Sequence, residues 1–96
     1  MRIQYRARAT ADIAEIYRYL EERSPDGARH VLQAIHDGIS LIAEQPWAGI
    51  QADDPSVRVK VVRRYRYKVF YAIVDNETVE ILHVRHTSRE PWRSGR

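Results

Sequence analysis

Hydrophobic and polar positions along this 96-residue chain follow two different periods, one in each half. In the first half, apolar residues recur at spacings of three and four, which places them on one face of a helix. In the second half, short stretches rich in Val, Ile, Tyr and Phe alternate with polar residues, as expected for strands. The pattern therefore predicts helices first and an antiparallel sheet afterwards.

The N-terminal segment predicts a short strand that leads into a helix. Residues 2–6 alternate between polar side chains and the apolar Ile3 and Tyr5. We expect Thr10 to cap the first helix, because a threonine hydroxyl can accept a hydrogen bond from a free N–H of the first turn. The apolar stripe of this helix ends near Arg23.

A second helix is predicted to begin at Ser24-Pro25 and to reach toward Gln45. Serine is a good N-cap, and proline is tolerated in the first helical turn. So short a connection makes the two helices fold back as a hairpin. Gly38 inside the second helix costs about 1 kcal/mol relative to alanine; a close approach to a neighbouring element would explain it, and so would tolerated drift. Residues 46–55 predict a loop, with Trp47 packed against the helix end.

Residues 57–86 predict three antiparallel strands joined by tight turns. The predicted order is strand 57–62, a charged turn at 63–66, strand 67–74, a hairpin turn at Asp75-Asn76, and strand 78–86. The whole chain thus has the order β-α-α-β-β-β. This order predicts an α+β fold with the helical hairpin packed on one face of a mainly antiparallel sheet.

The middle strand, residues 67–74, is apolar on both of its faces. Alternation divides its side chains into two sets, namely Tyr67, Val69, Tyr71 and Ile73 on one face, and Phe70, Ala72 and Val74 on the other. Such a strand needs cover on both faces, whereas one helical hairpin covers only one. We therefore expect a binding partner for the other face.

Length and composition indicate a single globular domain over residues 1–96. The chain has no cysteine, which excludes disulfides and thiolate metal sites. No apolar signal segment follows Met1, and the apolar run at 69–74 is far shorter than the roughly 20 residues of a membrane helix. We expect a cytoplasmic protein without membrane contact, with an irregular basic tail from about residue 87.

Charge is distributed unevenly along the chain. Residues 1–56 carry a net charge of −3, and residues 57–96 carry +6. Arginine outnumbers lysine 14 to 2, and the guanidinium group suits bidentate contacts to phosphates or carboxylates. The basic half is either a recognition surface for an acidic partner or nucleic acid, or a solvated face whose charges deter edge-to-edge aggregation.

The motifs and their order resemble the RelE/ParE superfamily of toxin–antitoxin toxins over nearly the full length. The resemblance is carried by Ala11-Asp12-Ile13, by Ser24-Pro25, by Arg58, and by residues 80–86 with Arg89 behind them. The long helical hairpin favours the ParE-like branch. The resemblance implies a type II toxin that arrests growth and is neutralised by the acidic amphipathic C-terminal segment of a cognate antitoxin. It also implies inhibition of DNA gyrase for a ParE-like toxin, with a RelE-like, ribosome-dependent mRNA endonuclease as the alternative.

An endonuclease would need a proton donor, a base and cations around the phosphate. The candidates are His86, Arg64, Tyr65, Arg85 and Arg89. His86 shares a strand face with apolar residues, so a core histidine is the rival interpretation. The RelE-like pattern also expects a catalytic Tyr or His near the C-terminal end, where this tail has Trp92, which cannot transfer a proton. We therefore favour no catalytic residue.

Binding is the function that the residues favour instead. For contact with the target we expect the cationic and aromatic residues near the sheet end and in the tail, namely Arg63, Arg64, Tyr65, Arg85, Arg89 and Trp92. For contact with the antitoxin we expect Tyr67, Val69, Tyr71, Arg58 and Lys60. A nucleic-acid-binding domain without toxicity is a third possibility. No cofactor is expected. No metal is expected either, because the spacings of the histidines along the predicted strand and helix point their side chains in different directions.

Overall fold

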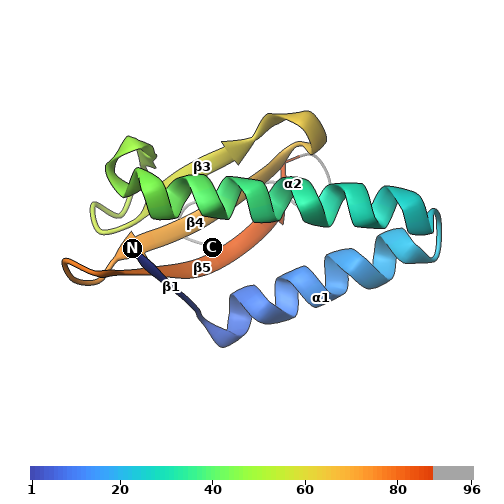
Figure 1. Ribbon diagram of the computed structural model, residues 1–96, viewed down its shortest axis with the longest axis horizontal. Coiled ribbons are helices and arrows are strands. Elements are labelled where there is room, and N and C mark those ends of the chain that lie inside the picture. Colours follow the sequence, from blue (N-terminus) through green and yellow to red (C-terminus); the bar gives the residue numbers. More distant parts are fainter. Residues whose placement is uncertain (88–96) are drawn as a thin grey trace.

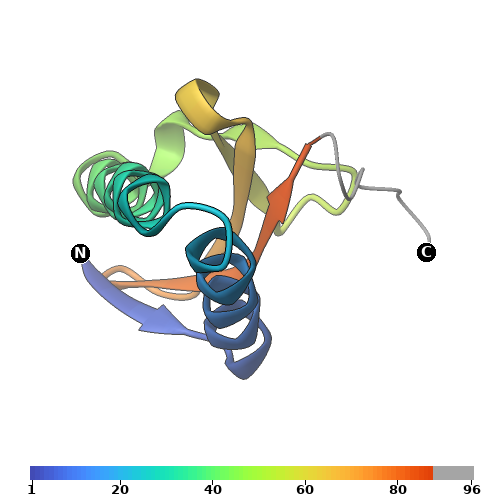
Figure 2. The ribbon, with the colours of Figure 1, turned by 90° about the vertical axis from the view of Figure 1, so that its right-hand side faces the viewer.

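The computed structural model describes residues 1–87 of the chain. Five strands form one sheet in the order β1-β5-β4-β3-β2, and two helices pack on one of its faces (Figures 1 and 2). The elements are β1 Arg2–Tyr5, α1 Ala7–Glu21, α2 Pro25–Glu44, the 3-10 helix η1 Pro46–Ala48, β2 Ile50–Gln51, β3 Arg58–Val62, the 3-10 helix η2 Arg63–Tyr65, β4 Tyr67–Ile73 and β5 Thr78–His86.

The predicted α+β class, the element order and the helical hairpin are confirmed. Among the strands of residues 1–87, β1 pairs in parallel with β5, and the other pairs are antiparallel. The segment predicted as a loop at 46–55 also contains η1 and the two-residue strand β2, which extends the sheet by one edge strand.

Helix α1 begins at Ala7, so the predicted cap at Thr10 is wrong. The N-cap is Arg6, whose side chain makes no capping hydrogen bond. Arg6 is still tied to the sheet, because its N–H donates to the Ile81 carbonyl at 3.0 Å, while its own carbonyl accepts from the Thr10 N–H at 3.1 Å. The strand thus runs directly into the helix, and sheet pairing fixes the first turn without a side-chain cap.

Helix α2 begins as predicted. The Ser24 hydroxyl accepts a hydrogen bond from the Gly27 N–H at 3.1 Å, with Pro25 at the first helical position. Of the two explanations for Gly38, the structure supports the close approach, since a Cβ there would lie 3.0 Å from Cγ2 of Val62. The glycine therefore lets α2 pack tightly on β3.

A β-bulge adjusts the pairing of the two central strands. Phe70 pairs with His83 but the next residue, Tyr71, pairs with Ile81, so Leu82 is the extra residue on β5. The bulge changes the phase of the alternation along β5. As a result Ile81 and Val84, three positions apart, both lie in the core under the helices.

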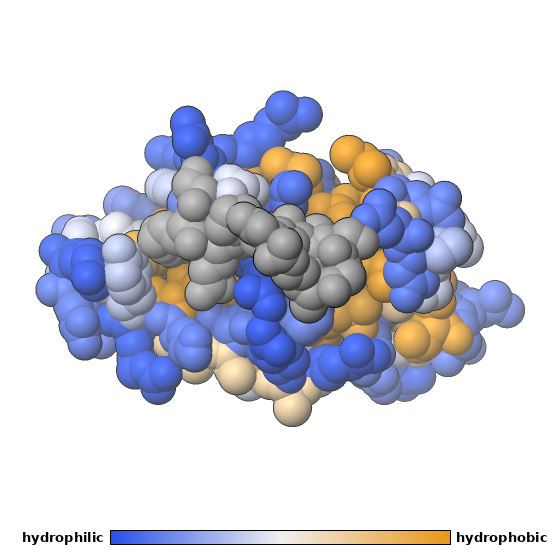
Figure 3. Space-filling model, turned by 180° about the vertical axis from the view of Figure 1, so that it is seen from behind, coloured by the Kyte–Doolittle hydropathy of each residue, from blue (hydrophilic) through white to orange (hydrophobic). Residues whose placement is uncertain are grey.

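The second sheet face carries no helix within the described residues (Figure 2). The register places Val59, Val61, Lys68 and Phe70 on this outer face. Seen from that side, hydrophobic areas lie among hydrophilic ones (Figure 3). Neither described helix is both long and apolar enough to cross a membrane.

Candidate functional site

The residues predicted to contact the antitoxin from β4 lie in the core. Tyr67, Val69 and Tyr71 are 1%, 0% and 0% exposed, and they pack against the helical hairpin. Their side chains are therefore not accessible to a partner in this structure. The sequence offered two alternating sets, and the helices cover this one because it continues the apolar face of β5. The set that faces away from the helices includes Lys68 and Phe70.

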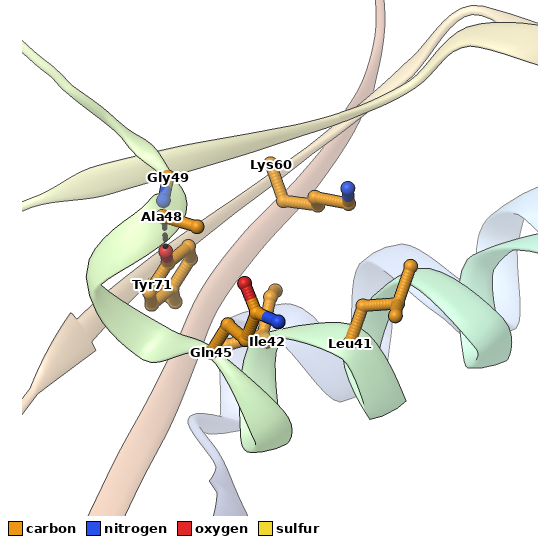
Figure 4. A pocket seen from close by; sticks show the side chains of 7 residues that line it. All are labelled: Leu41, Ile42, Gln45, Ala48, Gly49, Lys60 and Tyr71. Carbon is orange, nitrogen blue, oxygen red and sulfur yellow. Dashed lines mark hydrogen bonds between the residues drawn. The ribbon is translucent and has the colours of Figure 1, made fainter.

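Arg58, another predicted antitoxin contact, clamps a corner of the fold. Its guanidinium donates to the Gly49 carbonyl at 2.8 Å and to the Trp47 carbonyl at 3.2 Å, and it lies 5.0 Å from the Trp47 ring centroid. The Tyr71 hydroxyl completes the clamp by donating to the Pro46 carbonyl at 2.7 Å and accepting from the Gly49 N–H at 3.1 Å (Figure 4). Burial raises the pKa of Tyr71. These bonds hold η1 beside the end of α2.

Lys60, the remaining predicted antitoxin contact, borders a small pocket beside this clamp. The pocket has a volume of about 140 Å³, and Lys60 and Tyr71 line it together with the end of α2 (Figure 4). Trp47 does not pack against the helix end as predicted, because 68% of its surface is exposed. The clamp holds its backbone while leaving its ring in solvent, and the local sequence gave no signal for this.

The predicted charged turn is confirmed at η2, between β3 and β4. We use the name cationic turn for Arg63, Arg64, Arg66 and Lys68. Arg63, Arg64 and Arg66 are exposed, and Tyr65 is half-buried with the Arg64 guanidinium 5.4 Å from its ring centroid. Arg66 adopts a left-handed backbone conformation with φ 63°.

Arg85 extends the positive surface of the cationic turn across the sheet. It is half-buried on β5, directly opposite Lys68 on the outer face. Arg89 and Trp92, the other predicted target contacts, lie outside the described residues.

Most arginines of the helical half lie beside carboxylates. Arg6 lies 3.1 Å from Glu80, Arg8 lies 3.4 Å from Asp12, and Arg29 pairs with Asp26. By contrast, within residues 1–87 no carboxylate lies within ion-pairing distance of Arg63, Arg64 or Lys68. The positive charges of Arg63, Arg64 and Lys68 are thus not neutralised by carboxylates of the described part of the chain.

The two histidines of β5 pack against aromatic side chains of β4. His86 packs edge-to-face on Tyr67, with 5.0 Å between ring centroids. His83 packs in the same way on Phe70, and burial, followed by Arg8, lowers its pKa, while Asp12 acts in the opposite direction. Within residues 1–87 no group of histidine and carboxylate side chains is arranged to hold a metal ion.

Asp12 has a role that the sequence did not predict. Its Oδ2 accepts a hydrogen bond from the Val84 N–H at 3.1 Å, which ties α1 to β5. The pairing of β1 with β5 ends at Ile81, so the edge of β5 beyond that point would otherwise lack an acceptor. Asp12 belongs to the Ala11-Asp12-Ile13 motif, and this hydrogen bond explains what the carboxylate of the motif does in the fold.

An open apolar groove of about 370 Å³ lies between α1, α2 and β1. Its lining residues are Tyr5, Thr10, Ile13, Leu32, Ile35, His36 and Ile39. Strand β1 is an edge strand, and the N–H groups of Arg2 and Arg6 bond toward β5. The alternating N–H and C=O groups of Ile3 and Tyr5 therefore face the open edge. The groove and this edge form one continuous region that sequence analysis did not identify.

This arrangement defines a class of protein: a small α+β domain in which a helical hairpin, a cationic turn and an open groove present surfaces for binding. A family model described as "ParE toxin of type II toxin-antitoxin system, parDE" matches residues 3–91. The chain therefore belongs to the ParE toxin family.

Comparison with solved structures agrees on the fold. A structure described as "Chromosomal ParDE TA system from P. aeruginosa" matches with a TM-score of 0.77 and 20% sequence identity, and the match covers 90% of this chain and 95% of that chain. At this identity the likeness shows a shared fold. No curated protein matches the chain significantly.

Proposed function

We propose that this chain is a toxin that acts in the cytoplasm by binding DNA gyrase and that a cognate antitoxin neutralises it. Membership of the ParE toxin family gives the general class. The observation that supports the proposal is that Arg63, Arg64 and Lys68 have no ion-pairing carboxylate within residues 1–87, because an exposed positive surface can attract and orient an acidic target. In this proposal Arg63, Arg64, Tyr65 and Arg85 contact the target, together with Arg89 and Trp92.

The antitoxin docks, in this proposal, at the groove between the helices and β1. An amphipathic segment would place apolar side chains against Ile13, Ile35 and Ile39 in the groove. The open edge of β1 offers backbone groups beside it. A segment that folds on binding can cover such a large surface. Arg58 and Lys60 lie beside η1, so they would contact the antitoxin only where its segment extends from the groove to η1.

A gyrase supercoiling reaction tests the proposed activity. The purified chain should leave DNA relaxed or cleaved, and the variant R63Q/R64Q should require at least about tenfold more protein for the same effect, since two charge-assisted contacts are lost. The matched control R23Q/R29Q removes the same charge from the helical hairpin and should inhibit like the parent chain. Equal weakening of both variants would show that only net charge matters.

Programmed ribosomes distinguish the RelE-like alternative. An unaffected gyrase together with mRNA cut at the A site would identify a ribosome-dependent endonuclease. The structure favours binding over this reaction, because His86 packs its ring edge-to-face against the buried Tyr67.

A further inference from the structure

We propose that the pocket beside η1 receives an aspartate or glutamate side chain of a protein partner, and that Trp47 packs on the residue next to it. Lys60, Gln45 and Tyr71 line this pocket together with apolar side chains (Figure 4). In the proposed function the partner is the acidic segment of the antitoxin, and only this identity rests on the proposed function. The preference of the pocket for a carboxylate follows from its own residues.

The clamp at η1 fixes one wall of the pocket before any partner binds. The Tyr71 hydroxyl bonds to backbone groups of Pro46 and Gly49, and Arg58 bonds to the carbonyls of Trp47 and Gly49. A Cβ at position 49 would overlap the Tyr71 hydroxyl, so the glycine lets η1 lie directly against β4. A site that is already formed loses little conformational entropy when it binds a ligand.

Two polar side chains of the pocket remain for a ligand, because the clamp already uses the Tyr71 hydroxyl. Within residues 1–87, no carboxylate lies within ion-pairing distance of the Lys60 ammonium, and the side-chain amide of Gln45 makes no hydrogen bond. Figure 4 shows these two side chains on opposite sides of the pocket, Lys60 from β3 and Gln45 from the end of α2. Both can donate hydrogen bonds to a carboxylate placed between them.

The size of the pocket favours a single side chain over a small-molecule ligand. Its volume of about 140 Å³ is well below the roughly 300 to 1,000 Å³ of typical ligand pockets. Leu41, Ile42 and Ala48 form its apolar walls. These walls suit the methylene groups of an acidic side chain, while Lys60 supplies the charge that its carboxylate needs.

Exposed apolar side chains beside the pocket indicate that its partner is a protein. Trp47, the neighbour of Ala48 in sequence, is 68% exposed, and Leu41 on the pocket wall is 50% exposed. The Arg58 guanidinium lies 5.0 Å from the Trp47 ring centroid. Tryptophan and arginine are enriched among the residues that contribute most to protein–protein binding. A nucleic-acid backbone would instead require several cations at once, and the pocket contains only Lys60.

A pair of blocked dipeptides tests the preference for a carboxylate by NMR titration of the full chain labelled with ¹⁵N. N-acetyl-Glu-Leu-amide should shift the N–H signals of Ala48 and Gly49 and the indole N–H signal of Trp47 in a saturable way. N-acetyl-Gln-Leu-amide, which differs only in charge, should bind at least about fivefold more weakly, since it lacks the charge-assisted contact. Trp47→Ala should weaken binding of both dipeptides and keep the preference between them.

Replacing Lys60 with glutamine should remove the preference, so that Lys60→Gln binds both dipeptides with similar affinity. Arg29→Gln is the matched control, because it removes the same charge from the opposite end of α2 and should keep the preference of the parent chain. Thermal unfolding of both variants checks that they are folded. The comparison of the two dipeptides on the parent chain tests the proposal independently of any variant.

The proposal is overturned by equal binding of the two dipeptides to the parent chain, by an absence of shifts with either, or by an unchanged preference in Lys60→Gln. Tighter binding of 4-methylpentanoate than of the glutamate dipeptide would also overturn it, and would assign the pocket to a small carboxylate. The titration contains neither gyrase nor antitoxin. A failure of the proposed function therefore leaves its result unchanged, and a failure of this inference leaves gyrase inhibition to be judged by the supercoiling reaction.

Discussion

At Asp12 and Arg66, one residue connects segments that are far apart in the sequence. Asp12 accepts from the Val84 N–H, 72 residues away. The Arg66 carbonyl accepts from the Thr87 N–H at 2.8 Å, which joins the start of β4 to the end of β5. Arg66 makes this bond in a left-handed conformation that glycine or asparagine adopts more readily than arginine. The left-handed conformation at Arg66 therefore costs backbone energy that a glycine would avoid.

Replacing Arg66 with glycine should therefore leave the fold more stable than replacing it with alanine, since both variants lose the arginine side chain. Relief of the left-handed strain, less the extra chain entropy of glycine, should place the free energy of unfolding of Arg66→Gly about 0.5 to 1 kcal/mol above that of Arg66→Ala. Urea denaturation measures this change. Arg66→Ala removes the same charge without relieving the strain and should show no gain. A glycine variant less stable than the alanine variant would contradict the interpretation.

The burial of His83 predicts a dependence of stability on pH. Burial lowers the pKa of His83 in the folded protein below its ordinary value of about 6.5, so the unfolded chain binds a proton more readily. The contribution of His83 is fully present above pH 6.5 and is lost as the pH falls from there through the folded pKa. Urea denaturation between pH 7.5 and 5 should show a smaller acid loss for His83→Gln than for the parent chain. Parallel curves for the two proteins would exclude His83 as the cause.

At the scale of elements, α1 is attached to the sheet at the point where strand pairing stops. Strand β1 pairs with β5 only as far as Ile81. Asp12 then supplies the acceptor that a longer β1 would have supplied. The clamp at η1 works in the same way, since side chains of Arg58 and Tyr71 satisfy backbone groups where regular pairing is short. The fold thus uses side chains where the short strands β1 and β2 leave backbone groups unpaired.

Replacing Asp12 with alanine should detach this end of α1. The part-buried Val84 N–H would lose its acceptor, which costs about 1 to 3 kcal/mol. Asp12→Asn retains an acceptor oxygen and should recover much of the loss. Asp37→Ala on the exposed face of α2 is the matched control and should change the free energy of unfolding by less than about 0.5 kcal/mol. Equal losses from the two alanine variants would contradict the role of Asp12.

At the scale of the whole molecule, the arginines of the helical half and the cations of the cationic turn have different surroundings. Most arginines of the helical half lie beside carboxylates, for example Arg8 beside Asp12, so their charge is used within the fold. The cationic turn lies at the far end of the β3–β4 hairpin, where Arg63, Arg64 and Lys68 have no such carboxylate neighbours in the described chain. The groove between the helices and β1 is a separate region, so the two proposed partners need not compete for the same residues.

Local sequence determined the elements of this protein and their order. The Ser24-Pro25 start and the turn at Asp75-Asn76 act through hydrogen bonds between neighbouring residues. Such signals are visible in a sequence because the interacting groups are close along the chain. The charged turn at 63–66 could be predicted for the same reason.

Tertiary structure alone decided which face of β4 is inside, what Asp12 bonds to, and where the groove lies. A period of two gives two faces but does not say which one the helices cover, so Tyr67, Val69 and Tyr71 were expected at a surface and lie in the core. The cap at Thr10 failed because sheet pairing of Arg6 fixed the helix start. Each of these outcomes depends on contacts between residues dozens of positions apart, which no local pattern encodes.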